Sequence, residues 1–293
     1  MTLSMTPSMT QQRFIFKASC PSDRGIVAAI SDFLYQRGCY IEQMNEFDDR
    51  ESGNFFVRVL FALESGDLTQ EEFAETFSAV AERFSLNWEL HDTAIKPKVL
   101  IMVSKYDHCL NDLLYRWRTG HLPVDITAVV SNHPDLESLV NWHGIPYYHL
   151  PVTAETKPQQ EARLMELVAE TGSELVVLAR YMQVLSEDLC GKLQGRAINI
   201  HHSLLPGFKG AKPYHRAHDR GVKMVGATAH YVTADLDEGP IIAQGIKEVD
   251  HTYTTEGLIA TGRDTESVTL AKAVKAHCEQ RVFLNGNKAV VFN

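Results

Sequence analysis

The sequence predicts an α/β protein of two domains, a small βαββαβ domain followed by a larger one around a mostly parallel sheet. Three observations favour this class. The chain has 293 residues, about twice the length of an average domain. Predicted strands and helices alternate along it. After residue 98 the strands change from alternating apolar residues to fully apolar runs, which are typical of strands buried on both faces.

Residues 12–93 form the predicted first domain. Phe14 and Phe16 alternate with polar residues in the segment 13–20, as in a strand with one buried face. The next segments are a helix at 26–38, strands at 39–49 and 54–64, an amphipathic helix at 69–84 and a strand at 86–92. This order is that of a ferredoxin-like domain. Residues 1–11 are polar and are expected to form a disordered tail rather than a signal peptide.

Residues 94–98, around Pro97, form a linker to the second domain at 99–293. Apolar strands are predicted at 99–104, 126–131, 145–150, 174–179 and 196–200, with helices between them at 109–118, 136–143 and 160–172. This alternation favours a Rossmann-like, mostly parallel sheet. Strands at 226–232 and 239–249 have little helix between them and should add antiparallel partners, before a helix at 255–280 and a final hairpin.

Composition excludes several classes of protein. The net charge of −9 disfavours binding to nucleic acid, whose phosphates would be repelled. No apolar run approaches the ~18–20 residues that span a bilayer, so we expect no membrane association through a spanning helix. Five scattered cysteines without a CxxC pair argue against a disulfide framework or a structural zinc site. They fit the reducing environment of the cytoplasm.

Chemistry-bearing side chains concentrate between residues 197 and 240. On the strand that ends near His201, Asn199 and His201 point to the same face, because they are two residues apart. An amide can donate to a developing oxyanion, and an imidazole can exchange a proton near neutral pH. The alternative that both residues only satisfy the end of the strand remains open.

Acidic residues gather in the loop after the strand at 226–232. They are Asp235, Asp237 and Glu238. A carboxylate near His201 would fix the tautomer of that ring. A solvated acidic turn is the alternative.

Histidines crowd the same region and raise the question of a metal. They are His201, His202, His215, His218 and His230. No HExxH motif and no Cys/His quartet accompanies them, so we expect no metal. Ser203 lacks the GxSxG turn of a serine nucleophile. The segment 104–114 after the first strand has no glycine, which disfavours a phosphate-binding turn there.

The segment 198–242 resembles the signature of the folate-dependent formyltransferase family. It holds Asn-x-His, then SLLP, a His-Arg helix, a strand with an internal His, and Leu-Asp-x-Gly-Pro. The similarity continues through 176–186 and 249–266. It implies the formyltransferase fold, with Asn199, His201 and Asp237 as the catalytic trio. It also implies a folate pocket that includes Arg180, Tyr181, Met182, Val184, Leu185, His230, Asp235 and Leu236.

The first domain, with CPSDRG before its helix, resembles an ACT domain, a module that senses small molecules and forms oligomers. Such a fusion is similar to the formyltetrahydrofolate deformylase family, which hydrolyses 10-formyltetrahydrofolate to tetrahydrofolate and formate. The resemblance implies formate supply for purine synthesis, balanced one-carbon pools, a folate substrate without a further cofactor, and a homo-oligomer. It implies glycine or methionine as an effector near Asp23, Arg24, Gly25 and Asn45, although a purely structural role for this domain remains open.

Two features favour a hydrolase over a transferase. Glycinamide ribonucleotide formyltransferase has a Gly/Ser-rich phosphate loop after its first strand, whereas this chain has SKYDH at 104–108. His201 is followed by His202, where that relative usually has proline. A transferase that uses the same trio on an amine, and a binding protein without catalysis, remain the alternatives. His230 either supports the trio or is a core histidine.

Overall fold

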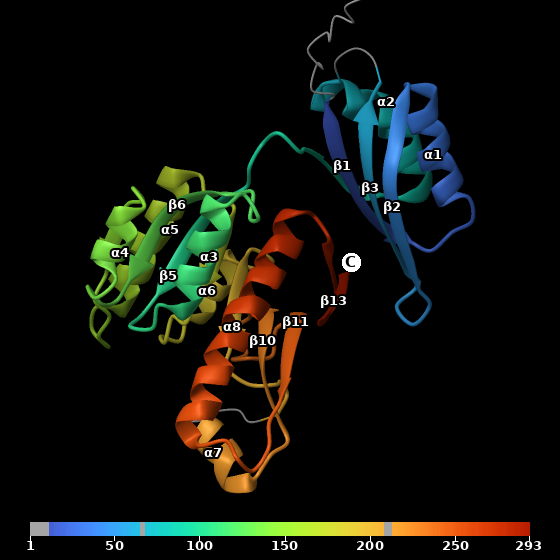
Figure 1. The fold of residues 1–293 in the computed structure, drawn as a ribbon. Coiled ribbons are helices and arrows are strands. Elements are labelled where there is room, and N and C mark those ends of the chain that lie inside the picture. Colours follow the sequence, from blue (N-terminus) through green and yellow to red (C-terminus); the bar gives the residue numbers. More distant parts are fainter. Residues whose placement is uncertain (1–11, 65–67, 208–212) are drawn as a thin grey trace, which may run out of the picture. The chain divides into compact units, whose positions relative to one another are not determined.

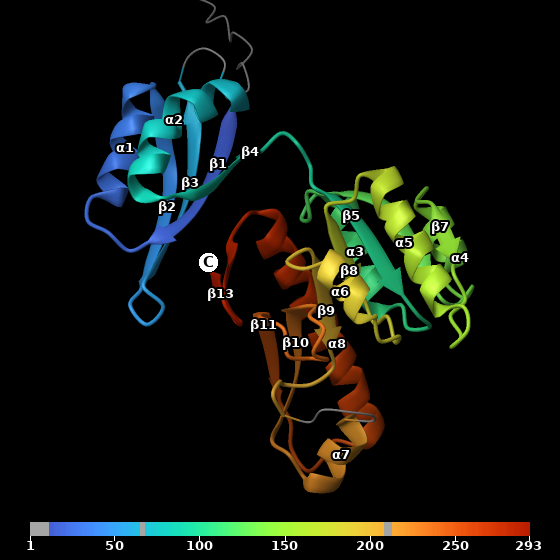
Figure 2. The same ribbon diagram turned by 180° about the vertical axis from the view of Figure 1, so that it is seen from behind.

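The computed structural model describes residues 12–64, 68–207 and 213–293 (Figures 1 and 2). The tail expected at 1–11 lies outside the described residues. The chain divides into two compact units between Ile95 and Lys96. The predicted linker at 94–98 spans this division, although Lys98 already belongs to the first strand of the second unit.

The first unit has the predicted order of strands and helices. It contains β1 (Arg13–Pro21), α1 (Ile26–Gln36), β2 (Cys39–Asp49), β3 (Asn54–Leu63), α2 (Gln70–Phe84) and β4 (Asn87–Asp92). The strands form an antiparallel sheet in the order β2-β3-β1-β4. Phe16 of β1 packs against Phe73 and Phe77 of α2, and the ring centroids lie 5.9 and 5.1 Å apart. The alternation of apolar residues in β1 therefore buries one face of the sheet under the helices.

The second unit is built around a seven-stranded mixed sheet in the order β11-β10-β9-β8-β5-β6-β7. Its parallel part contains β5 (Lys98–Val103), α3 (His108–Arg118), β6 (Asp125–Ser131), α4 (Glu137–Trp142), β7 (Tyr147–His149), α5 (Lys157–Thr171), β8 (Leu175–Leu178), α6 (Glu187–Lys192) and β9 (Ala197–His201). The rest contains α7 (Pro213–Arg220), β10 (Met224–Tyr231), β11 (Ile241–Glu248), α8 (Thr255–Cys278) and the hairpin β12 (Val282–Asn285) and β13 (Lys288–Val291). β10 and β11 are antiparallel, as predicted.

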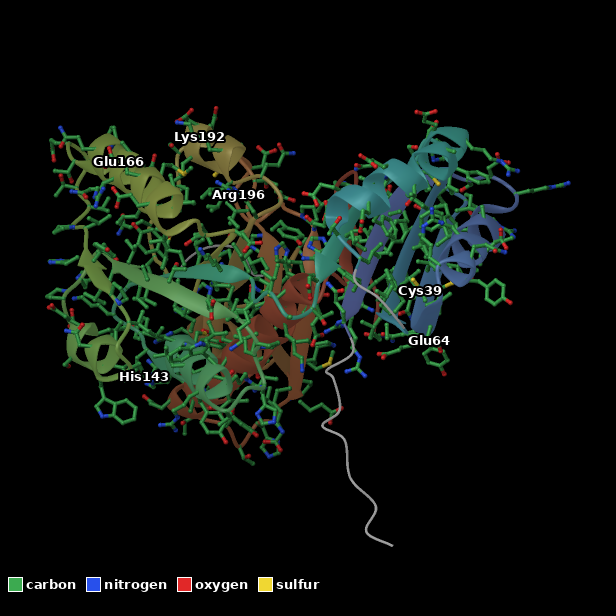
Figure 3. The ribbon with its side chains drawn as sticks, turned by 90° about the horizontal axis from the view of Figure 1, so that it is seen from above. Cys39, Glu64, His143, Glu166, Lys192 and Arg196 are labelled. Atoms are coloured by element: carbon green, nitrogen blue, oxygen red, sulfur yellow. The ribbon has the colours of Figure 1, made fainter. Side chains whose placement is uncertain are left out.

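Helices cover both faces of this sheet. Ile101 of β5 packs in one apolar cluster with side chains of α3, α4 and α8, whereas its neighbour Met102 packs with those of α5 and α6. Figure 3 shows Glu166 of α5 and Lys192 of α6 on one side of the sheet and His143, just after α4, on the other. The fully apolar strands of the sequence are explained by this burial on two faces.

Strand order changes direction between β5 and β8, and this places the functional loops. From β5 the chain adds β6 and β7 on one side, then returns to add β8 and β9 on the other. Ligands of open α/β sheets bind at the carboxyl ends of strands near such a reversal. None of the helices among the described residues is long and apolar enough to cross a membrane.

Candidate active site

A cleft of about 430 Å³ opens at the carboxyl ends of β8 and β9. It is lined by the loop after β8, the end of β9, part of β10 and the loop before β11. The lining residues are Leu178, Arg180, Tyr181, Met182, Gln183, Val184, Leu185, Cys190, Asn199, Ile200, His201, His202, His230, Val232, Thr233, Ala234, Leu236 and Asp237. The cleft thus contains every residue of the predicted trio and folate pocket except Asp235.

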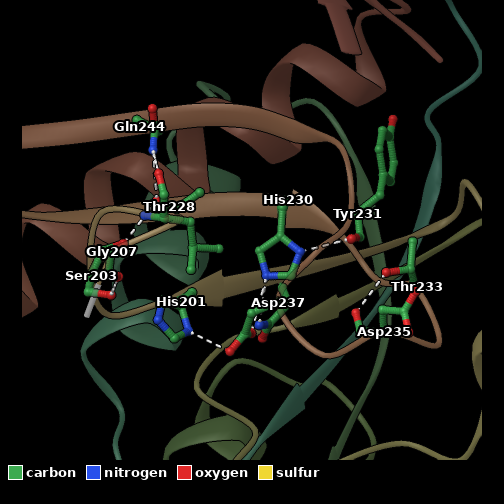
Figure 4. Close-up of polar contacts among 12 residues, drawn as sticks. His201, Ser203, Gly207, Thr228, His230, Tyr231, Thr233, Asp235, Asp237 and Gln244 are labelled. Atoms are coloured by element: carbon green, nitrogen blue, oxygen red, sulfur yellow. Dashed lines mark hydrogen bonds and ion pairs between the residues drawn. The ribbon is translucent and has the colours of Figure 1, made fainter. Parts of the chain in front are cut away.

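The structure brings the three predicted catalytic side chains together with His230. Figure 4 shows His201, Asp237 and His230 of this group. The Nδ1 atom of His201 lies 3.2 Å from Oδ2 of Asp237, and Nε2 of His230 lies 3.6 Å from Oδ1 of the same carboxylate. The Nδ2 atom of Asn199 is 3.3 Å from Nε2 of His230. His230 reaches this position because it pairs directly with Asn199 across the antiparallel strands β9 and β10.

The loop that carries Asp237 has backbone geometry that few residues adopt. Asp237 has φ 60°, in the left-handed region. A Cβ atom at Gly239 would lie 1.8 Å from the carbonyl oxygen of Tyr231, so the loop can return to the sheet only with glycine there. The amide of Tyr231 then donates to the carbonyl of Pro240 at 2.9 Å. This tight return turns the Asp237 carboxylate toward the two histidines.

Asp237 is held as a carboxylate. Burial opposes its charge, but hydrogen bonds from His201 and His230 outweigh burial and hold the pKa of Asp237 well below its usual range. The carboxylate fixes a proton on Nδ1 of His201. The Nε2 atom of His201 is buried and has no hydrogen-bond partner among the described residues. It is therefore available to a substrate.

The tautomer of His230 is set by the backbone. Its Nδ1 lies 2.8 Å from the carbonyl oxygen of Tyr231, so Nδ1 carries a proton. In the neutral ring Nε2 accepts from the amide of Asn199, and in the charged ring it donates to Asp237. His230 is 2% exposed. It is thus a buried histidine of the sheet that also contacts Asn199 and Asp237.

The loop after β8 forms the apolar rim of the cleft. Arg180 has φ 65°, and the amide of Met182 donates to Oγ of Ser104 at 3.0 Å, which ties this loop to the end of β5. Met182, Val184 and Leu236 have exposed side chains. Asp235 does not line the cleft; it is exposed, and its carbonyl accepts from the hydroxyl of Thr233.

Glu266 of α8 was missed by sequence reasoning. It is 1% exposed, and its carboxylate receives hydrogen bonds from His108 at 2.8 Å and Tyr214 at 2.7 Å. The Nε atom of Arg180 lies 3.3 Å away. Burial opposes the charge, but His108, Arg180 and Tyr214 lower the pKa of Glu266. The sequence does contain a sign of its burial, because Glu266 lies four residues from Gly262 and from Leu270, which are buried on the same face of α8.

A buried group of possible metal ligands overlaps this network. Donor atoms of His108, Cys109 and Glu266 lie within 4.8 Å of one another. The group does not fit a cation, because Glu266 already binds two donors and faces the guanidinium of Arg180.

The predicted effector residues lie on two elements of the first unit. Gly25, with φ 88°, precedes α1, and Oδ1 of Asp23 accepts from the amide of Arg24 at 2.7 Å. Asn45 lies on β2, and its Oδ1 atom is buried without a hydrogen bond among the described residues. No hydrogen bond or ion pair within the described part of the chain joins Asn45 to the loop that contains Asp23, Arg24 and Gly25.

Comparison with known proteins identifies related sequences and structures. Residues 97–274 match the "Formyl transferase" family model. A formyltetrahydrofolate deformylase from Corynebacterium sp. (strain P-1) is 53% identical over 281 residues, which cover 96% of this chain and 98% of that protein. The crystal structure of the deformylase from Burkholderia mallei ATCC 23344 has 55% identity and a TM-score of 0.92, covering 96% of this chain and 100% of that chain.

A transferase is also similar, but over less of the chain. The structure of glycinamide ribonucleotide transformylase 1 from Symbiobacterium toebii is 29% identical with a TM-score of 0.64, and it covers 70% of this chain and 98% of that chain. The deformylases match both units, whereas the transferase match leaves nearly a third of this chain uncovered. The chain belongs to the formyltetrahydrofolate deformylase family.

Proposed function

We propose that this protein hydrolyses 10-formyltetrahydrofolate to tetrahydrofolate and formate, and that it thereby supplies formate for purine synthesis and balances one-carbon pools. The observation that carries the proposal is the contact between His201 and Asp237, 3.2 Å apart beside Asn199 in a cleft large enough for a folate head group. Family membership supports the choice of substrate.

The trio provides the groups that amide hydrolysis needs. Asn199 and the Nε2 side of His201 polarise the formyl oxygen and stabilise the oxyanion that forms when water adds. Asp237 acts through His201, because its carboxylate faces Nδ1 of that ring and stabilises the protonated imidazole. The folate nitrogen leaves after it has been protonated. No step requires a metal or a further cofactor.

The folate ring system would lie between the loop at 180–185 and the segment before Asp237. Both segments present backbone groups and apolar side chains, and Leu178 and Val232 line the cleft between them. Such a lining suits a flat heterocycle whose polar edge meets backbone donors and acceptors.

The experiment that separates hydrolysis from transfer omits any amine acceptor. Purified protein with 10-formyltetrahydrofolate is expected to release one formate for each tetrahydrofolate formed, measured by formate dehydrogenase and by absorbance. Exhaustive chelation is expected to leave the rate unchanged. Formate release that starts only when an amine is added would instead establish a transferase, and activity that zinc restores after chelation would establish a metal site.

The first unit supports a proposal of its own. Its antiparallel sheet in the order β2-β3-β1-β4, packed against two helices, supports the proposal that it is an ACT domain. We assign to this unit the formation of oligomers and the binding of an amino acid near Asp23, Arg24, Gly25 and Asn45. The buried Oδ1 of Asn45 without a partner can accept from an ammonium group.

Titration calorimetry with glycine and with methionine tests the regulatory role. At least one of them is expected to bind and to change the rate of formate release. The Asn45→Ala variant is expected to weaken that binding, because the amide oxygen is lost. No heat and no kinetic change with either amino acid would leave this unit a structural role alone.

A further inference from the structure

His202 lies in the cleft beside the trio and has no task in the mechanism above. Its ring is edge-on to that of His201, with centroids 5.1 Å apart and planes at 78°. The ring of Tyr214 lies 6.3 Å away. Within the described residues, no group forms a hydrogen bond with the ring nitrogens of His202. These nitrogens can therefore serve a ligand in the cleft.

The carboxylate and the guanidinium of the cleft already face other charged or titratable groups. The two oxygens of Asp237 face the rings of His201 and His230. Arg180 offers donors alone and pairs with the carboxylate of Glu266. A water molecule that attacks a formyl carbon needs an acceptor for its proton, on the side away from the oxyanion donors. His202 lies next to His201 and can provide that acceptor.

The charge state of His202 suits an acceptor. Burial, to which the nearby charges of Arg180 and His201 add, lowers the pKa of His202 to about 4. At neutral pH the ring therefore keeps one nitrogen without a proton. Such a ring can accept a hydrogen bond from water through that nitrogen, whereas His201 already meets the carboxylate of Asp237 through Nδ1.

We propose that His202 holds the attacking water and accepts its proton, an inference that rests on the proposed hydrolysis. The water oxygen forms a bond to the formyl carbon while the carbonyl electrons move to the oxygen held by Asn199 and His201. One water proton passes to His202. The folate nitrogen then takes up that proton from His202, its bond to carbon breaks as the oxyanion re-forms the carbonyl, and formic acid loses its own proton to solvent.

Competition between water and hydroxylamine tests this role. Hydroxylamine attacks through its own nitrogen, so formohydroxamate and tetrahydrofolate form without a water to position. In the His202→Ala variant we expect formate release to fall by about 10²-fold, with formohydroxamate formation reduced much less. The ratio of hydroxamate to formate should therefore rise at least about tenfold. The KM for folate should stay within about threefold of the wild-type value.

The His202→Gln variant keeps an acceptor atom and is expected to retain more formate release than the alanine variant. The matched control is His218→Gln, because His218 is exposed on α7 outside the cleft. An unchanged rate in His202→Ala, or an equal fall of both products, would overturn the proposal. If the alanine variant does not fold, the ratio of hydroxamate to formate is measured in the glutamine variant and compared with the wild-type ratio. Wild-type protein that releases no formate would refute the proposed function itself.

Discussion

Replacing Asn199 by alanine is expected to lower formate release by about 10²–10³-fold while the protein folds normally. In the proposed mechanism the amide donates toward the position where negative charge develops, and alanine leaves that oxyanion without one of its donors. Asp237→Asn should cost at least as much, because the neutral amide no longer stabilises a protonated His201 across the 3.2 Å contact. Steady-state kinetics with 10-formyltetrahydrofolate measure both effects.

Circular dichroism and thermal unfolding show whether each variant is folded. The control is Asp188→Asn, because Asp188 is an exposed carboxylate on α6, 2.7 Å from Lys192 and outside the cleft. It should retain the wild-type rate. If folded Asn199→Ala protein releases formate at the wild-type rate, the amide has no role in the mechanism. The same result with Asp237→Asn would show that the carboxylate has none.

The second large effect is expected on stability. Glu266→Ala should lower the free energy of unfolding by about 3–5 kcal/mol, because it leaves the buried Arg180 and the partly buried His108 without their carboxylate. Chemical denaturation measures the change. The control is Glu166→Ala on α5 (Figure 3), since Glu166 is exposed and its pairing with Arg163 is worth at most about 1 kcal/mol.

The dependence on pH gives a second check. The pKa of Glu266 is lower in the folded protein than its ordinary value of 4.5. Its stabilising contribution is therefore complete above about pH 4.5 and is lost as the pH falls through the folded pKa. The difference in unfolding free energy between wild-type and Glu266→Gln protein should narrow in acid. A difference that stays constant between pH 7 and pH 3 would contradict this role.

Strand and helix periodicity predicted most elements, because burial imposes a repeat that can be read along the chain. The mixed sheet and the antiparallel β10 and β11 are confirmed. The helix α6 was not predicted. Its six residues, Glu187–Lys192, are too few to show a repeat, and its start depends on Ser186, whose hydroxyl accepts from the amide of Leu189.

Side-chain contacts were harder to predict than elements. The pairing of Asn199 with His230 depends on the register between two strands, which no local pattern reveals. The network of Glu266 joins α3, α7, α8 and the loop after β8, so its members are up to 158 positions apart in sequence. Contacts between residues so far apart in sequence follow from the topology of the sheet. The chemistry of each residue type, in contrast, could be predicted from the sequence.

The carboxylate of Asp237 and its two histidine partners come together only where β10 pairs with β9, the last of the parallel strands. His201 ends β9, His230 belongs to β10, and Asp237 lies on the return from β10 to β11. During refolding, recovered turnover therefore reports the pairing of β9 with β10 and the closure of the loop before β11.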